Sequence, residues 1–187
     1  MATTYIIIGI SVILIIFLVS TYNRFVTYKN NRENAFADID VQLKQRHDLI
    51  PQLIGSVKGY MDHEREVLTQ VTEARNKAMG ASTISDKIKS ENELSSAMRG
   101  FNIQVEAYPD LKASEGFLQL QDEISDIENK LASSRRYFNS ATRELNTAIE
   151  KFPNNMFAGM FGFKTQEMFD LGDNQRVALD KSPEVKF

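Results

Sequence analysis

Cysteine is absent from the 187 residues, and the chain contains only 9 glycines and 4 prolines. The absence of cysteine excludes a disulfide framework, a thiolate zinc site and a cysteine nucleophile. So few glycines and prolines argue against a loop-rich all-β protein, because turns between short strands rely on these two residues. The chain has the length of one domain, and its composition lacks the residues of most metal and triad chemistry.

A surplus of either charge is also lacking, and histidine is rare. The sequence has 22 Lys and Arg against 25 Asp and Glu, which gives a net charge of -3. This balance argues against a nucleic-acid partner, because phosphate contacts need a basic surplus. The two histidines, His47 and His63, lie too far apart in sequence to share a metal on one helical turn. We therefore predict no catalytic residue, cofactor, metal or small-molecule substrate.

The N-terminal segment carries no charge before Arg24 and consists mostly of isoleucine, leucine and valine. Its uncharged run reaches the roughly 20 residues that a bilayer-spanning helix needs. Tyr5 and Tyr22 bracket the run, as aromatic residues do at membrane interfaces. No basic segment precedes the run and no small-x-small site follows it, which argues against a cleaved secretory signal. We expect a single-pass transmembrane helix over residues 5–22, with residues 1–4 as an exoplasmic stub.

Basic residues follow this segment directly, because Arg24, Lys29 and Arg32 all precede the first acid, Glu33. The positive-inside bias places such a flank in the cytoplasm. We expect the rest of the chain on the cytoplasmic face, with the periplasmic or extracellular face as the alternative.

Beyond the anchor, apolar residues recur in steps of three and four, a pattern typical of helices and of coiled-coil packing. The pattern predicts helices at about residues 24–79, 86–107 and 114–151. The clearest apolar stripe belongs to the last of these: Phe117, Leu120, Ile124, Ile127, Leu131, Phe138, Ala141, Leu145, Ala148 and Phe152. No comparable period-two alternation appears. We predict an all-α protein in which residues 23–163 form an antiparallel bundle of three to four long helices.

The three predicted helices differ too much in length to cover one another. At about 1.5 Å per residue, they would extend about 84, 33 and 57 Å. Either the first helix breaks near Pro51, with Asp48 capping a new start, or its membrane-proximal half packs against another protomer. An unpaired apolar stripe over residues 25–50 would be rare in a monomer. The second alternative predicts a homo-oligomer.

Residues 154–163, with the sequence NNMFAGMFGF, are rich in large apolar side chains and carry no charge. We expect this segment to fold back over the end of the bundle, with a protein interface or insertion into interfacial lipid as alternatives. Its large apolar residues are Met156, Phe157, Met160, Phe161 and Phe163. The tail, residues 164–187, is polar and without periodicity, and we expect it to be weakly ordered.

Two charged residues, Arg46 and Glu64, fall on the apolar stripe of the first predicted helix, where a charge must be paired or reach water. An ion pair at such a position is better evidence for helix register than for stability. The candidate partners are Glu106 and Asp110 near the second turn, and Arg135 and Arg136 on the third helix.

The turn Tyr108-Pro109-Asp110-Leu111 follows from its proline, which fixes φ and pushes the preceding Tyr108 out of helical conformation. Its predicted role is architectural, and the alternative is that its exposed residues bind a partner.

Several motifs resemble the LemA family, and they occur in order over residues 22–163. They are Tyr22-Asn23, the run from Ile39 to Pro51, Val57-Lys58-Gly59-Tyr60, His63-Glu64, the run from Glu106 to Ala113, Arg135-Arg136-Tyr137-Phe138-Asn139, Phe152-Pro153 and Phe161-Gly162-Phe163. Phe138 stands where the family pattern has tyrosine, so one hydroxyl is missing here. The resemblance implies a helical bundle on a single span in a bacterial inner membrane, without established catalytic residues. It also implies an association with membrane zinc metalloproteases of the HtpX type.

Four functions are consistent with these features. The first is a membrane-anchored scaffold that self-associates through its long helices and organises partner proteins. The second is an adaptor for a membrane metalloprotease in membrane-protein quality control, docking through residues 106–113 or 156–163. The third is an enzyme whose site is built from Arg46, His47, Asp48, Glu64 and Glu106. The fourth is membrane remodelling by residues 154–163. We predict the first.

Overall fold

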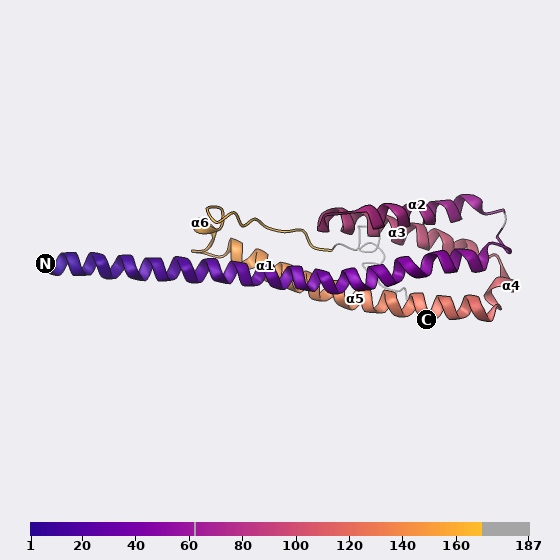
Figure 1. Ribbon diagram of the computed structural model, residues 1–187, viewed down its shortest axis with the longest axis horizontal. Helices are drawn as coiled ribbons and strands as arrows, with labels where there is room; N and C mark the ends of the chain where they lie inside the picture. The colour runs from indigo at the N-terminus through magenta and orange to yellow at the C-terminus, as the bar shows by residue number, and fades with distance from the viewer. Residues whose placement is uncertain (62, 170–187) are drawn as a thin grey trace, which may run out of the picture. The chain divides into compact units, whose positions relative to one another are not determined.

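The computed structural model describes residues 1–61 and 63–169, and every regular element within them is a helix (Figure 1). This confirms the all-α prediction. The helices are α1 (Ala2–Val57), α2 (Arg65–Gly80), α3 (Ile84–Val105), α4 (Pro109–Lys112), α5 (Glu115–Glu150) and α6 (Asn155–Ala158). The chain forms two compact units, one from residues 1–38 and 134–168 and the other from residues 39–133 with Phe169. Both α1 and α5 contribute to both units.

The first predicted helix, residues 24–79, is wrong as a single element. Helix α1 continues through Pro51 and ends at Val57, and α2 begins only at Arg65. The break falls at Gly59, a weak helix former, and not at Pro51. The amides of Tyr60 and Met61 both donate to the Val57 carbonyl, at 2.9 and 3.0 Å, which closes the last turn.

Pro51 lies inside α1 because another helix satisfies the carbonyl that the proline leaves open. A proline has no N–H, so the carbonyl four residues earlier, on His47, loses its partner within the helix. The Arg75 side chain from α2 donates its Nε–H to this His47 oxygen at 2.6 Å. A buried or half-buried carbonyl is costly when unpaired, so this contact removes much of the reason for a break at Pro51.

The other two predicted helices lie within two residues of α3 and α5. The N-cap of α3 is Thr83. The Thr83 hydroxyl oxygen accepts a hydrogen bond from the Asp86 amide at 3.1 Å.

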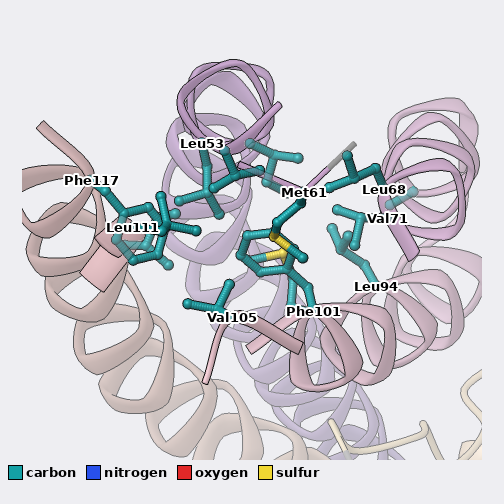
Figure 2. Close-up of a cluster of buried hydrophobic side chains, with 14 residues drawn as sticks. Leu53, Met61, Leu68, Val71, Leu94, Phe101, Val105, Leu111 and Phe117 are labelled. Atoms are coloured by element: carbon teal, nitrogen blue, oxygen red, sulfur yellow. The ribbon is translucent and has the colours of Figure 1, made fainter. Parts of the chain in front are cut away.

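The core of the second unit is a cluster of fourteen buried residues supplied by α1 to α5 and the turn after α1 (Figure 2). Met61, which directly follows the end of α1, points into this cluster beside Phe101. The members are Ile50, Leu53, Val57, Met61, Leu68, Val71, Ala78, Leu94, Met98, Phe101, Val105, Leu111, Phe117 and Ile124.

The apolar stripe of α1 beyond its uncharged N-terminal run is buried within the chain itself. Phe25, Ala35 and Phe36 in the first unit are all buried, and the Phe36 ring packs edge-on against Phe138 of α5 with 5.5 Å between ring centroids. Of the two alternatives drawn from the predicted lengths, neither holds here: α1 does not break at Pro51, and its stripe is covered without a second protomer. Helix α5 lies alongside α1 in this unit, and the predicted lengths alone did not indicate this pairing.

Candidate functional site

The N-terminal part of α1 is long and apolar enough to cross a membrane, by length and composition. None of that stretch is buried against other described residues, and Figure 1 shows it extending past α6 without a neighbouring helix among them. Its isoleucines and leucines are at least half exposed at most positions, which a water-soluble surface would not tolerate. The candidate site begins where this stretch meets the rest of the first unit.

A short loop at the end of α5 packs against α1 at that point. We call residues 152–163, which include α6, the α6 loop. The Asn154 side chain donates to the Ala148 carbonyl at 3.2 Å and fixes the start of the loop. Gly162, with φ of 76°, closes its end: the amides of Gly162 and Phe163 donate to the carbonyls of Gly159 and Ala158, the pattern of a Schellman motif.

Aromatic rings of the α6 loop lie on α1. The Phe161 and Phe163 rings pack against Tyr22 with centroid distances of 5.4 and 5.9 Å, and Phe163 also lies 5.0 Å from Phe25. Nearer the N-terminus, Phe157 packs edge-on against Phe17 at 6.2 Å. The expectation that this segment folds back onto the helices is met for these rings.

The predicted residues Met156 and Met160 behave differently from the phenylalanines of the same segment. Met156 is 63% exposed and Met160 is 80% exposed. The segment therefore has one face on α1 and another that no described residue covers, so the expected fold-back accounts for only part of its apolar side chains.

The chain after the α6 loop returns along α5. Asn146 and Gln166 exchange two hydrogen bonds of 2.9 and 2.8 Å through the amide side chain of Asn146. Arg32 also donates to the Glu167 carbonyl at 3.2 Å. Residues 164–168 are thus held in place, contrary to the expectation of weak order for the whole tail, while residues 170–187 lie outside the described residues.

Arg32 ties α1 to α5 in the first unit. Its Nε donates to the Thr142 hydroxyl at 3.2 Å, and its guanidinium lies 4.8 Å from the Phe138 ring centroid. Burial lowers the pKa of Arg32, while the nearby carboxylates of Glu33 and Glu167 oppose that shift. A cavity of about 430 Å³ opens beside these groups. Its lining includes Tyr22, Lys29, Arg32, Glu33, Phe163 and Lys164.

In the second unit, Arg46 is the centre of a buried ion cluster. The side chains of Arg46 and Glu91 are each 1% exposed, and Arg46 Nη1 lies 3.1 Å from a Glu91 oxygen. Arg46 Nη2 lies 2.7 Å from Glu128 Oε1, and His47 Nε2 lies 2.6 Å from the other Glu91 oxygen. The Ser95 hydroxyl accepts a further bond from Arg46 at 3.2 Å.

This cluster links α1, α3 and α5, and its charged groups are largely occupied by one another and so are poorly placed to act on a substrate. Both oxygens of Glu91 are used, and neither Arg46 nor Glu91 is open to a substrate. A paired buried charge of this kind fixes the register of helices, because a slip would leave it unpaired. Among residues 1–61 and 63–169, no three His, Cys, Asp or Glu side chains are arranged to hold a metal ion.

The structure does not join the other predicted site residues to Arg46. Glu64 accepts a 3.4 Å hydrogen bond from the Tyr108 hydroxyl, and Glu106 pairs with Lys112 at 2.5 Å on the surface. The Tyr108 pKa is raised, first by desolvation and then by the charge and hydrogen bond of Glu64. Asp110 and Arg136 are exposed and Arg135 is half-buried. The predicted partners of Arg46 are therefore wrong, and the proposed enzymatic group is not assembled.

The sequence did contain a signal for the residues that were missed. Glu91 precedes Leu94 and Met98 in the same steps of three and four, so it continues the buried stripe of α3. Arg32 likewise precedes Phe36 by four residues on α1. Glu128 is harder to find, because it lies beside its stripe and is partly exposed.

Comparison with known proteins identifies the family of the chain. The LemA family model matches residues 35–187. Protein LemA of Metamycoplasma hominis is 29% identical over 163 residues, covering 86% of this chain and 74% of that protein. Magnetosome protein MamQ of Magnetospirillum gryphiswaldense is 22% identical over 191 residues, covering 86% of this chain and 70% of that one. With an apolar N-terminal helix, an all-helical structure and a family match over most of its length, the chain is a membrane-associated helical protein that belongs to the LemA family.

Proposed function

We propose that the protein is a membrane-anchored, non-enzymatic scaffold that organises partner proteins at the inner membrane of a bacterium. One observation carries the proposal: α1 is a single helix that contains the uncharged run and also contributes to the cores of both units. A bilayer that holds its N-terminal part therefore holds both units, without an intervening linker. The basic residues after the run favour the cytoplasmic face for them.

Exposed apolar positions on the second unit support partner binding. A groove of about 520 Å³ lies between the end of α1 and α2, and Ile54, Met61 and Leu68 contribute its apolar lining. Ile103 on α3 is 71% exposed. Large apolar side chains in these places fit a surface for another protein better than a bare surface in water.

The burial of the α1 stripe favours an adaptor as a second form of the proposed function. A scaffold that self-associates through this stripe needs it to be available, and residues such as Phe36 are already covered within the chain. An adaptor works as one copy per partner and has no such need. Membrane zinc metalloproteases of the HtpX type, expected from the family resemblance, are the partner class for this form, and membrane-protein quality control is the process.

Light scattering of the full-length protein in mild detergent, with the detergent mass subtracted, distinguishes the two forms. A mass near 21.3 kDa favours the adaptor, and a discrete multiple of it favours the self-associating scaffold. In either form, a photo-crosslinking residue at Ile103 should trap specific membrane proteins in cells. The same residue at buried Leu43 is the control, and equal, non-specific products at both positions would contradict the proposal.

A further inference from the structure

We propose that the α6 loop is a second membrane contact, in which Phe152, Met156 and Met160 enter the lipid interface beside α1. The inference rests on the proposed function in one respect, because it requires the uncharged part of α1 to span the bilayer. It adds that the bundle is held by two elements and not by the span alone.

The depth of the loop follows from its contact with α1. Phe157 packs on Phe17, which lies seven residues before Arg24, the first charged residue, or about 10 Å along the helix axis. The span is expected to end near Tyr22, at the membrane–water interface, and Phe17 lies about 7–8 Å deeper along the helix axis. This depth is as large as the whole polar interface on one side of a bilayer, which is about 5–8 Å thick. The tip of the loop therefore reaches the edge of the hydrocarbon.

The exposed side chains of the loop suit this position. Phe152 is 74% exposed, Met156 is 63% exposed and Met160 is 80% exposed, whereas Ala158 in the same loop is buried. Three large apolar residues within nine positions form a patch that water covers poorly. At the level of Phe17 the surrounding medium is lipid, which covers such side chains at no cost.

Charges around the loop also fit a membrane surface. Between Glu150 and Glu167 the sequence has no acidic residue, and Lys151 and Lys164 flank the loop, both exposed. On α1, Arg24 is exposed at the corresponding end of the span. Basic residues on each side of an apolar tip are the arrangement that interfacial segments use with anionic headgroups.

Hydrogen bonds and ring contacts hold the α6 loop in one orientation on α1. Asn154 binds the Ala148 carbonyl at its start and the Gly162 turn closes its end. The Phe161 and Phe163 rings on Tyr22 hold its inner face. Its exposed methionines are therefore presented in a defined direction relative to α1.

Single cysteines test the proposal cleanly, because the chain has none. Met156→Cys and Met160→Cys are compared with Tyr137→Cys, a 58% exposed position in the same unit, and with Ile13→Cys in the span. Tyr137 precedes Phe138, which packs on Phe36, about 21 Å along α1 from Tyr22. The full chain is placed in nanodiscs containing anionic phospholipid, one chain per disc, and treated with a charged, membrane-impermeant thiol reagent.

We expect modification at positions 156 and 160 to be at least tenfold slower than at position 137, and modification at position 13 to be slower still. With one chain per disc, a second copy cannot be the cause. If position 13 is protected but 156 and 160 react as fast as 137, the inference is overturned and the anchor stands. If position 13 itself reacts quickly, the span is wrong and both proposals fall.

A second measurement uses the absence of tryptophan. In Met160→Trp the new indole is the only one in the chain, and phospholipids with brominated acyl chains should quench at least half of its emission. The matched control, Tyr137→Trp, should remain unquenched. Emission from Met160→Trp that matches the control in wavelength and quenching would overturn the inference.

Discussion

The hydrogen bond from Arg75 to the His47 carbonyl can be tested by removing either its donor or the proline that makes it necessary. Arg75→Ala leaves the carbonyl without a partner, since Pro51 has no N–H to offer. A half-buried polar group left unpaired costs about 1–3 kcal/mol, and the partial exposure of Arg75 places the expected loss at about 1–2 kcal/mol.

Pro51→Ala changes that cost in a predictable direction. The alanine supplies an N–H four residues after His47, so the carbonyl regains an ordinary helical partner. In this background, Arg75→Ala should destabilise the protein by about 1 kcal/mol less than it does alone, a coupling within the range for groups that share one contact.

The assay is thermal unfolding of the full-length protein in mild detergent, followed by circular dichroism. For a chain of this size, each kcal/mol moves the Tm by about 2–4 °C, so Arg75→Ala alone should lower it by about 2–8 °C. The control is Arg99→Ala, since Arg99 is exposed and its hydrogen bond to Ser96 lies within α3. Equal losses from Arg75→Ala with and without Pro51 would refute the account of why α1 continues through the proline.

Three further results are expected. Glu91→Ala removes a buried carboxylate from Arg46 and should cost about 3 kcal/mol in urea unfolding, the low end for a broken buried pair, because Glu128 still pairs with the guanidinium. Glu93→Ala breaks an exposed pair and should cost about 1 kcal/mol or less. Tyr108 should titrate above the ordinary tyrosine pKa in a ¹³C NMR titration, and Glu64→Gln should lower that pKa. The stability that the protonated phenol contributes is complete below the unfolded pKa, near 10, and is lost as pH rises through the folded value. Arg32→Lys removes the guanidinium that bonds both the Thr142 hydroxyl and the Glu167 carbonyl, and a Tm about 2–6 °C lower is expected by circular dichroism.

The sequence pattern predicted burial and exposure well wherever these depend on the neighbouring residues along the same helix. The stripe of α5 from Phe117 to Ala148 is buried as its steps of three and four require, with Leu120 half-buried. Phe152, predicted as its last member, lies beyond α5 and is 74% exposed. The uncharged N-terminal run depends only on composition, and α1 retains it as an exposed helix. The extent of the span, residues 5–22, and the face on which the bundle lies remain predictions.

Pattern failed where a residue depends on a distant partner. Glu64 fitted the stripe of a continuous helix, yet the chain turns after Val57 and Met61 enters the core in its place. Spacing along one helix says nothing about which helix lies opposite, so the partners of Arg46 were assigned to the wrong segments.

The sequence by itself determined the helical class, the uncharged apolar N-terminal run and the absence of cysteine chemistry, because these follow from residue type and period. Only the tertiary structure decided that Glu91 and Glu128 neutralise Arg46, that Arg75 makes Pro51 tolerable, and that Phe157 lies on Phe17. Each of these contacts joins residues separated by at least 28 positions. Such contacts form only when the helices pack, and packing is a property of the whole fold rather than of any one segment.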